Sequence, residues 1–151
     1  MPVGYFEDYE VGQIERFGRY EVTREEVIEF ASKYDPQPFH LDDEAAAANP
    51  VFGRLAASGW HTAGMAMRMT IDEANKRGGF GMGSPGLDEL RWLKPVYPGD
   101  TLSLEIEVLA KSEPRSRPEI GFVKLCTTVF NQHGEPVMRQ VANTIHPKRS
   151  E

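Results

Sequence analysis

The chain has few of the residues that most often indicate a disulfide, a metal site or a membrane span. Its 151 residues include one cysteine and four histidines. Cys126 therefore has no partner for an internal disulfide, and its strand-like apolar surroundings predict a buried, inert thiol. We find no apolar run of membrane-span length and no basic-then-apolar leader. These absences predict a cytoplasmic protein with no membrane partner.

Positive charge is scarce as well. Lysine and arginine number 17 against 23 aspartates and glutamates, which gives a formal net charge of -6. This balance argues against nucleic acid as the main partner. The hydrophobic content of 40% is ordinary for a globular protein. Because no repeat, linker or low-complexity tract divides the sequence, we expect one domain over residues 1–151.

Two prolines fall inside the segment Asp35-Pro-Gln-Pro-Phe-His40. Each fixes its own φ and removes a backbone donor, which excludes a continuing helix or a central strand. The segment is predicted to be a stiff loop that holds Asp35 and His40 toward one small volume. A fixed acid and base are typical of proton transfer to and from a substrate. The alternative is structural, since Asp-Pro often starts a turn and a loop histidine is often only a surface group.

Helical signals occupy most of the first half of the chain, after a plausible first strand from Gln13 to Val22. Thr23 and Glu26 match a capping box, in which each side chain satisfies a backbone donor at the helix start. This helix must end by Asp35, because the residue before a proline disfavours helical geometry. Asp42 is expected to cap a short alanine-rich helix that stops at 49–50.

The segment from Trp60 to Lys76 is apolar nearly all round in its first half, which predicts a helix buried on every side. Gly64 would let a sheet approach this helix closely. Four strand-like runs follow, at 86–95, 101–111, 119–131 and 136–145. The order indicates an α+β domain with an antiparallel sheet. A sheet curved around one buried helix is the hotdog fold, and periodicity alone leaves it as one option among several.

Several motifs occur here in an order that resembles the MaoC-like dehydratases, a family that includes the (R)-specific enoyl-CoA hydratases. They are Asp35-Pro-Gln-Pro-Phe-His40-Leu-Asp42, then Ala57-Ser58-Gly59 opening an apolar helix, then Leu90-Arg-Trp-Leu-Lys-Pro-Val-Tyr-Pro-Gly-Asp100. The resemblance extends roughly from Phe6 to the last strand. It implies the hotdog fold, with an antiparallel sheet wrapped around a long central helix, and at least a homodimer.

The resemblance also implies an activity, the syn addition of water to a trans-2-enoyl-CoA or the reverse dehydration of a 3-hydroxyacyl-CoA. Asp35 and His40 would hold and deprotonate the water and return a proton to C2. Gly59 would offer its backbone N–H to the thioester oxygen, as a helix N-terminus suits developing negative charge. The substrate is a coenzyme A thioester, and no metal or redox cofactor is needed.

Substrate contacts are expected from Gln37, Pro38, Ser58 and Trp60, and CoA phosphate contacts from Arg115 and Arg117. For the two arginines the alternative is a solvated loop. Many family members have Asn in place of Gln37 and His-Gly in place of Ser58-Gly59, so the identity of the substrate is open. Ser58 itself reads as a helix N-cap rather than a nucleophile.

The same residues bear on two alternative functions and on a possible metal site. A hotdog thioesterase more often places its carboxylate on the central helix, which here has no acid before Asp72. A non-catalytic acyl-CoA-binding protein is the third possibility. His61 is expected to pack or cap, and His133 and His146 to lie on the surface. His40 with Asp42 and Asp43 lacks a second histidine at ligand spacing, so no metal site is predicted.

Overall fold

The computed structural model describes residues 4–79 and 81–149. Its main feature is a single antiparallel sheet in the order β1-β3-β4-β5-β2. The strands are β1 Ile14–Glu21, β2 Gly86–Trp92, β3 Thr101–Ser112, β4 Ile120–Phe130 and β5 Pro136–Pro147. In β3 the predicted alternation holds, because Leu102, Leu104, Ile106 and Val108 are all buried.

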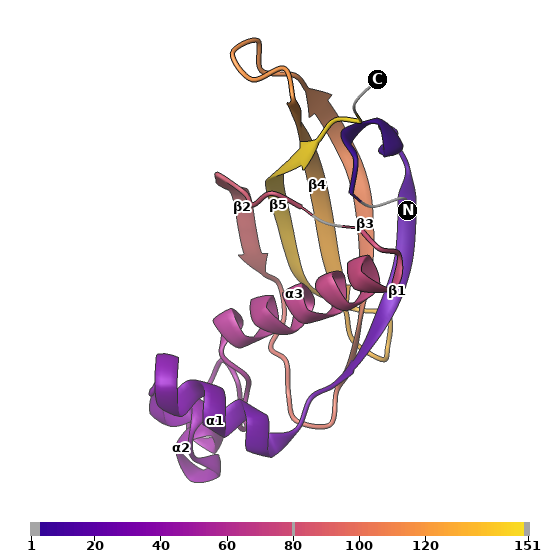
Figure 1. The fold of residues 1–151 in the computed structure, drawn as a ribbon. Coiled ribbons are helices and arrows are strands. Elements are labelled where there is room, and N and C mark those ends of the chain that lie inside the picture. Colours follow the sequence, from indigo (N-terminus) through magenta and orange to yellow (C-terminus); the bar gives the residue numbers. More distant parts are fainter. Residues whose placement is uncertain (1–3, 80, 150–151) are drawn as a thin grey trace.

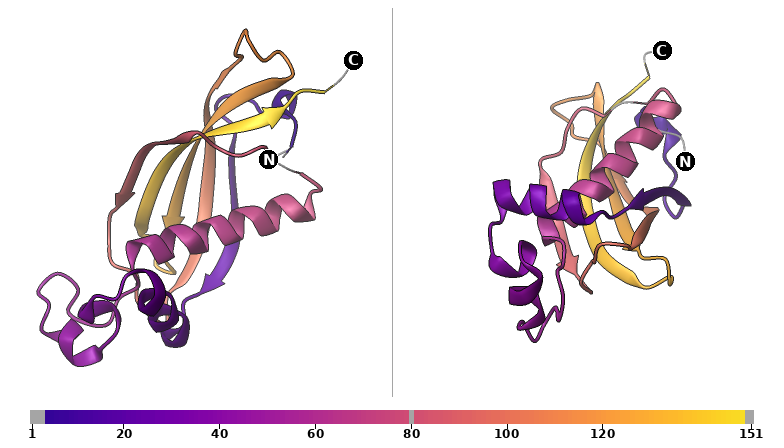
Figure 2. Two further views of the ribbon diagram at one scale, coloured as in Figure 1. Left: turned by 60° about the vertical axis from the view of Figure 1, so that its left-hand side comes forward. Right: turned by 90° about the horizontal axis from the view of Figure 1, so that it is seen from below.

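The sheet curves around one long helix, α3, which spans Gly59–Lys76 (Figure 1). Met65, Ala66 and Met69 of this helix are buried in the main core, and Figure 2 shows α3 lying along the concave face of the sheet. The α+β architecture and the hotdog arrangement predicted for the chain are therefore confirmed.

The prediction that α3 is buried on every side is wrong for the single chain. Trp60, Met67 and Ile71 are 58%, 53% and 46% exposed. They recur at helical spacing along one face, while the sheet covers only the opposite face. Gly64 also differs from expectation, because a side chain added there would meet nothing within 4 Å.

Three shorter helical elements lie beyond the N-terminal end of α3 (Figures 1 and 2). They are α1 Arg24–Tyr34, the short 3-10 helix η2 Pro38–His40 and α2 Asp43–Ala47. A second short 3-10 helix, η1 Phe6–Asp8, precedes β1. Thr23 Oγ accepts from the Glu26 N–H at 3.2 Å, and an Asp42 carboxylate oxygen accepts from the Ala45 N–H at 2.9 Å. Both predicted N-caps are present, and Asp35 is the C-cap of α1.

Two details of the sequence interpretation need correction. The strand predicted to reach Pro95 ends at Trp92, where the chain turns so that the Leu93 N–H donates to the Val137 carbonyl. His146 is buried, not on the surface, because its ring packs against Tyr9 with centroids 4.6 Å apart. Burial lowers its pKa, although a hydrogen bond with the Gly4 carbonyl opposes this. Cys126 is buried as predicted.

Within 4–79 and 81–149, no helix is long and apolar enough to cross a membrane.

Candidate active site

The predicted acid, Asp35, is held by two side chains where α1 ends. Ser58 Oγ donates to Asp35 Oδ2 at 2.7 Å, and Gln37 Nε2 donates to Asp35 Oδ1 at 2.6 Å. Pro36 ends the helix directly after Asp35, so the backbone turns there. Because both carboxylate oxygens have a donor, the orientation of the acid is fixed.

The predicted base, His40, lies beside this carboxylate at the end of η2. Its Nε2 is 3.5 Å from Asp35 Oδ2. Its Nδ1 is 2.7 Å from the Ala56 carbonyl oxygen. A carbonyl oxygen only accepts, so Nδ1 carries the hydrogen and donates it, and in the neutral ring Nε2 keeps its lone pair toward Asp35. The pairing of these two residues, expected from the two prolines, is present in the fold.

A cavity of about 370 Å³ opens at the pair and includes Asp35 and His40 in its lining. Its walls are mostly apolar, and they come from the 50–53 turn, the start of α3 and the segment after β2. The apolar lining residues are Val51, Phe52, Ala57, Trp60, Trp92, Leu93, Pro95 and Val96. An acid and a base at the end of an apolar cleft match the usual form of a small-molecule site.

Gly59, the first residue of α3, also lines the cavity and carries one of the helix N–H groups that have no intrahelical partner. A side chain is excluded there, because an added Cβ would lie 2.5 Å from Trp92 Cε2. The indole of Trp92 donates from Nε1 to the Gly59 carbonyl oxygen at 2.8 Å. Its ring also meets Trp60 edge-on, with centroids 5.1 Å apart. Trp92 thus covers the helix start and fixes its backbone.

Ser58 does not cap α3 with its side chain as predicted. It is fully buried, and its hydroxyl donates a hydrogen bond to Asp35 instead. Burial raises the pKa of Asp35, but the hydrogen bonds from Ser58 and Gln37 and the charge of His40 outweigh that effect and hold the pKa below its usual value. The acid is therefore a carboxylate at neutral pH.

We expect Ser58→Ala to raise the pKa of Asp35, because the variant loses a donor that stabilises the charged form. The acid limb of the pH–rate profile should then move to higher pH, and activity should fall first at low pH. A profile of kcat/KM from pH 4 to pH 8 measures this. Ser58→Thr, which keeps the hydroxyl, is the control, and an identical limb in wild type and Ser58→Ala would contradict the assignment.

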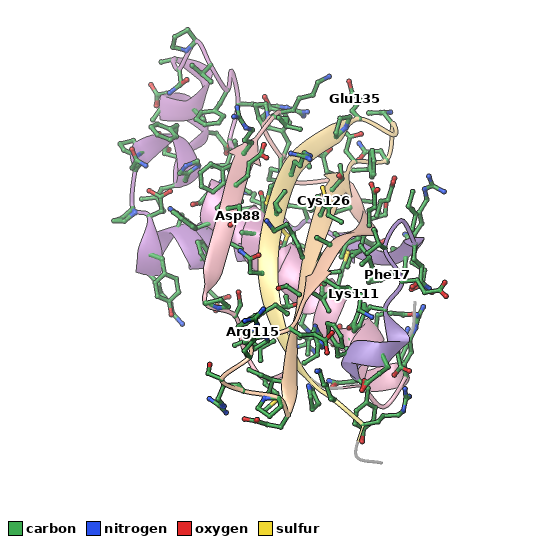
Figure 3. The ribbon with its side chains drawn as sticks, turned by 90° about the horizontal axis from the view of Figure 1, so that it is seen from above. Phe17, Asp88, Lys111, Arg115, Cys126 and Glu135 are labelled. Carbon is green, nitrogen blue, oxygen red and sulfur yellow. The ribbon has the colours of Figure 1, made fainter. Side chains whose placement is uncertain are left out.

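The other residues expected to meet substrate are placed differently. Trp60 lines the cavity, whereas Gln37 contacts Asp35 and Pro38 begins the 3-10 turn. Arg115 and Arg117 lie on the β3–β4 loop, and Figure 3 shows Arg115 far along the sheet from Glu135. Glu135 pairs with the cavity residue Lys94, so within one chain the two arginines lie at the opposite end of β4.

The lining residues that the sequence did not identify include Phe52, Trp92, Leu93 and Lys94. Trp92 and Lys94 fall within the motif Leu90–Asp100 that carried the family resemblance, so their position in that motif was the available signal. Phe52 lies in a turn without any such signal. No group of three or more His, Cys, Asp and Glu side chains in the described part of the chain could hold a metal ion.

Comparison with known proteins defines the class of this fold and site. The family model of the MaoC like domain matches residues 10–126 of this chain. A MaoC-like dehydratase from Rhodospirillum rubrum is 38% identical, with 97% of this chain and 99% of that chain covered and a TM-score of 0.87. An (R)-hydratase from A. caviae involved in PHA biosynthesis is 28% identical, with 93% and 98% covered and a TM-score of 0.71.

A curated relative, the 3-hydroxybutyryl-CoA dehydratase of Methylorubrum extorquens, is 31% identical over 126 residues, which are 80% of this chain and 74% of that protein. These proteins share a hotdog fold. The chain belongs to the MaoC-like domain family, which includes hydratases and dehydratases.

Proposed function

We propose that the protein adds water to a trans-2-enoyl-CoA, or removes it from a 3-hydroxyacyl-CoA, with Asp35 and His40 as its general acid–base pair. The observation that carries the proposal is the 3.5 Å approach of His40 Nε2 to Asp35 Oδ2 in the lining of a mostly apolar cavity. The pair provides a basic nitrogen and a carboxylate on the same side of any substrate bound there.

In the hydration direction, a water held between Asp35 and His40 loses a proton to the pair as its oxygen bonds to C3 of the enoyl group. The C2–C3 π electrons move toward the thioester and give an enolate. The pair then returns a proton to C2, which completes the addition of one water molecule. Because both transfers involve the same pair, hydroxyl and hydrogen add to one face of the double bond.

The enolate oxygen needs a positive partner, and in this proposal the N–H of Gly59, the first residue of α3 and part of the cavity lining, supplies one. The first N–H groups of a helix point outward, and the helix dipole adds a partial positive charge. Such donors typically contribute about 10²–10³-fold to kcat. In this proposal the thioester itself acidifies C2, and no metal or redox cofactor takes part.

One paired assay separates the candidate functions. The enzyme is incubated with crotonyl-CoA and, separately, with butyryl-CoA, while enoyl absorbance and free thiol are followed in parallel. A hydratase consumes enoyl absorbance and releases no thiol from either compound. Thiol release from both compounds identifies a thioesterase, and no reaction with a panel of enoyl-CoA chain lengths identifies a binding protein.

The positions of the acidic residues on α3 do not support the thioesterase alternative. Asp72 and Glu73 lie near the end of α3 away from Asp35, where they pair with Arg68 and Arg77. The CoA phosphate contact of Arg115 and Arg117 stays a prediction from the sequence. Arg117 pairs with Glu119 in this chain, and a strand of 11 residues, roughly 35 Å long, separates the loop from the turn beside Lys94.

We further expect the protein to be at least a homodimer in solution. Trp60, Met67 and Ile71 form an apolar face of α3 that stays exposed to solvent within the described chain. The edge strand β2 also leaves one side without a strand partner. A second copy would cover both features.

Sedimentation at micromolar concentration tests the dimer. Wild type should sediment with about twice the 17.0 kDa mass of the chain, and Met67→Glu should shift the equilibrium toward monomer because it places a charge on the apolar face. Arg68→Glu, one residue along and already solvated, is the control. A stable wild-type monomer with full activity would contradict this prediction.

A further inference from the structure

A second polar cluster joins three elements on the far side of the α3 N-terminus from the cavity lining. Tyr20 of β1 donates its hydroxyl hydrogen to Glu26 Oε1 of α1. His61 Nε2 of α3 lies 3.1 Å from the same oxygen. A carboxylate oxygen accepts, so the His61 Nε2 carries the hydrogen. Glu26 thereby receives one donor from the sheet and one from the central helix.

The cluster corrects the sequence interpretation of Glu26. A capping box would return this carboxylate to the Thr23 N–H, but only the Thr23 half of the box forms, and the carboxylate bridges Tyr20 and His61 instead. Burial raises the pKa of Glu26, and the hydrogen bonds from Tyr20 and His61 outweigh it, so the pKa is lowered. Burial, then the bond to Glu26, raises the pKa of Tyr20 to about 12. The phenol is therefore a donor at neutral pH.

His61 is held in this place although one of its ring nitrogens makes no hydrogen bond within the described residues. Its side chain is buried, and its Nδ1 has no hydrogen-bond partner among the described residues. A buried polar atom without a partner costs free energy. The ring is fixed by the Glu26 bond and by stacking on Phe30, with centroids 4.8 Å apart and planes 9° apart. Both contacts are with α1.

This contact lies where it can control the geometry of the active site. Glu26 is on the helix that ends at Asp35, nine residues or roughly 13 Å away. His61 is two residues after Gly59 on α3, whose N-cap is Ser58. The buried bond between Ser58 and Asp35, the C-cap of α1, joins the ends of the same two helices. If α1 shifts against α3, the acid moves relative to both Ser58 and the Gly59 N–H.

We propose that Glu26 is a positioning residue: by accepting from Tyr20 and His61 it clamps α1 to α3 and so sets Asp35 against Ser58 and Gly59. Only the kinetic measurement described below depends on the proposed hydration activity. It assigns no substrate contact to Glu26 or to His61.

The key comparison is between Glu26→Ala, which removes the acceptor, and Glu26→Gln, which keeps a carbonyl oxygen for both donors while removing the charge. Glu29→Ala, an exposed glutamate one turn further along α1, is the matched control. We expect Glu26→Ala to lower kcat for enoyl-CoA hydration about tenfold, with KM little changed. Glu26→Gln and Glu29→Ala should stay within about twofold of wild type.

A merely structural role would reduce the folded fraction but leave Asp35 in its wild-type surroundings. The distinguishing readout is therefore the titration of Asp35, followed by NMR of protein labelled with ¹³C in the aspartate carboxyl groups and assigned with Asp35→Asn. In Glu26→Ala the pKa of Asp35 should rise because its bond to Ser58 is lost. Removal of the Glu26 charge alone would lower that pKa, so the direction separates the two causes. His40 is the titratable group facing Asp35, and Lys94 lines the same cavity.

An unchanged Asp35 titration in folded Glu26→Ala would overturn the proposal, and so would a Glu26→Gln variant that behaves like Glu26→Ala. If Glu26→Ala does not fold, Tyr20→Phe removes one of the two donors at constant shape and should move Asp35 in the same direction. No movement in Tyr20→Phe would then count against the clamp. Because the titration needs no turnover, it is decisive even if wild type hydrates no enoyl-CoA, which would defeat the proposed function alone.

Discussion

Asp35→Asn and His40→Gln are each expected to lower kcat for enoyl-CoA hydration by about 10²–10⁴-fold. The two groups lie 3.5 Å apart, and in the proposed mechanism they act on one water, so neither should be effective without the other. The double variant should be scarcely slower than either single variant, since residues that act as a unit are strongly non-additive. Steady-state kinetics with crotonyl-CoA measures all three, with Glu44→Gln on the exposed side of α2 as control.

The two substitutions should differ in their effect on stability. His40 is only 4% exposed, packs against Phe39 and Phe52, and donates to the Ala56 carbonyl. His40→Gln is expected to lower the free energy of unfolding by about 1–3 kcal/mol, the range for disturbing a buried hydrogen bond. Asp35 lies at the cavity edge, so Asp35→Asn should cost less. Near-wild-type turnover by either folded variant would show that the pair is structural.

Gly59→Ala is expected to reduce kcat about 100-fold, within the range seen when an oxyanion donor is lost. The added Cβ would lie 2.5–2.7 Å from three atoms of the Trp92 indole. Trp92 must then move, and its bond to the Gly59 carbonyl breaks, so the N–H at the start of α3 loses its fixed direction. Steady-state kinetics should show the loss mainly in kcat, because enolate charge develops only in the transition state.

A double-mutant cycle tests the stated cause. In a Trp92→Ala background the space beside Gly59 is open, so adding Gly59→Ala should cost much less than it does in wild type. A penalty of the same size in both backgrounds would mean that the indole is not the obstacle, and that the loss comes from another property of the helix start.

The closeness of Asp35 and His40 was the feature of the candidate site that the sequence predicted best. Pro36 and Pro38 exclude a continuing α-helix and a strand between the two residues, so the local chain alone brings the side chains close. Thr23 and Asp42 were predictable caps for the same reason, because each bond joins residues three apart in sequence.

Features that depend on contacts between distant segments were not predictable in this way. Ser58 is the N-cap residue of α3 as predicted, but its hydroxyl donates to Asp35, 23 residues earlier, and makes no capping bond. Glu26 looked like half of a capping box, although its carboxylate contacts His61, 35 residues later. His146 was assigned to the surface because nothing local indicates its packing against Tyr9. In each case a tertiary partner outweighed the local pattern.

The stereochemistry of addition tests most directly whether Asp35 and His40 transfer both protons on one face of the substrate. Crotonyl-CoA is hydrated in D₂O, and the relative configuration at C2 and C3 of the product is read from the NMR coupling constants. The pair at one end of the cavity predicts that deuterium and hydroxyl add syn, in a single diastereomer. Anti addition, or a mixture of both diastereomers formed by the enzyme, would require a second proton-transfer group on the opposite face and would contradict the account.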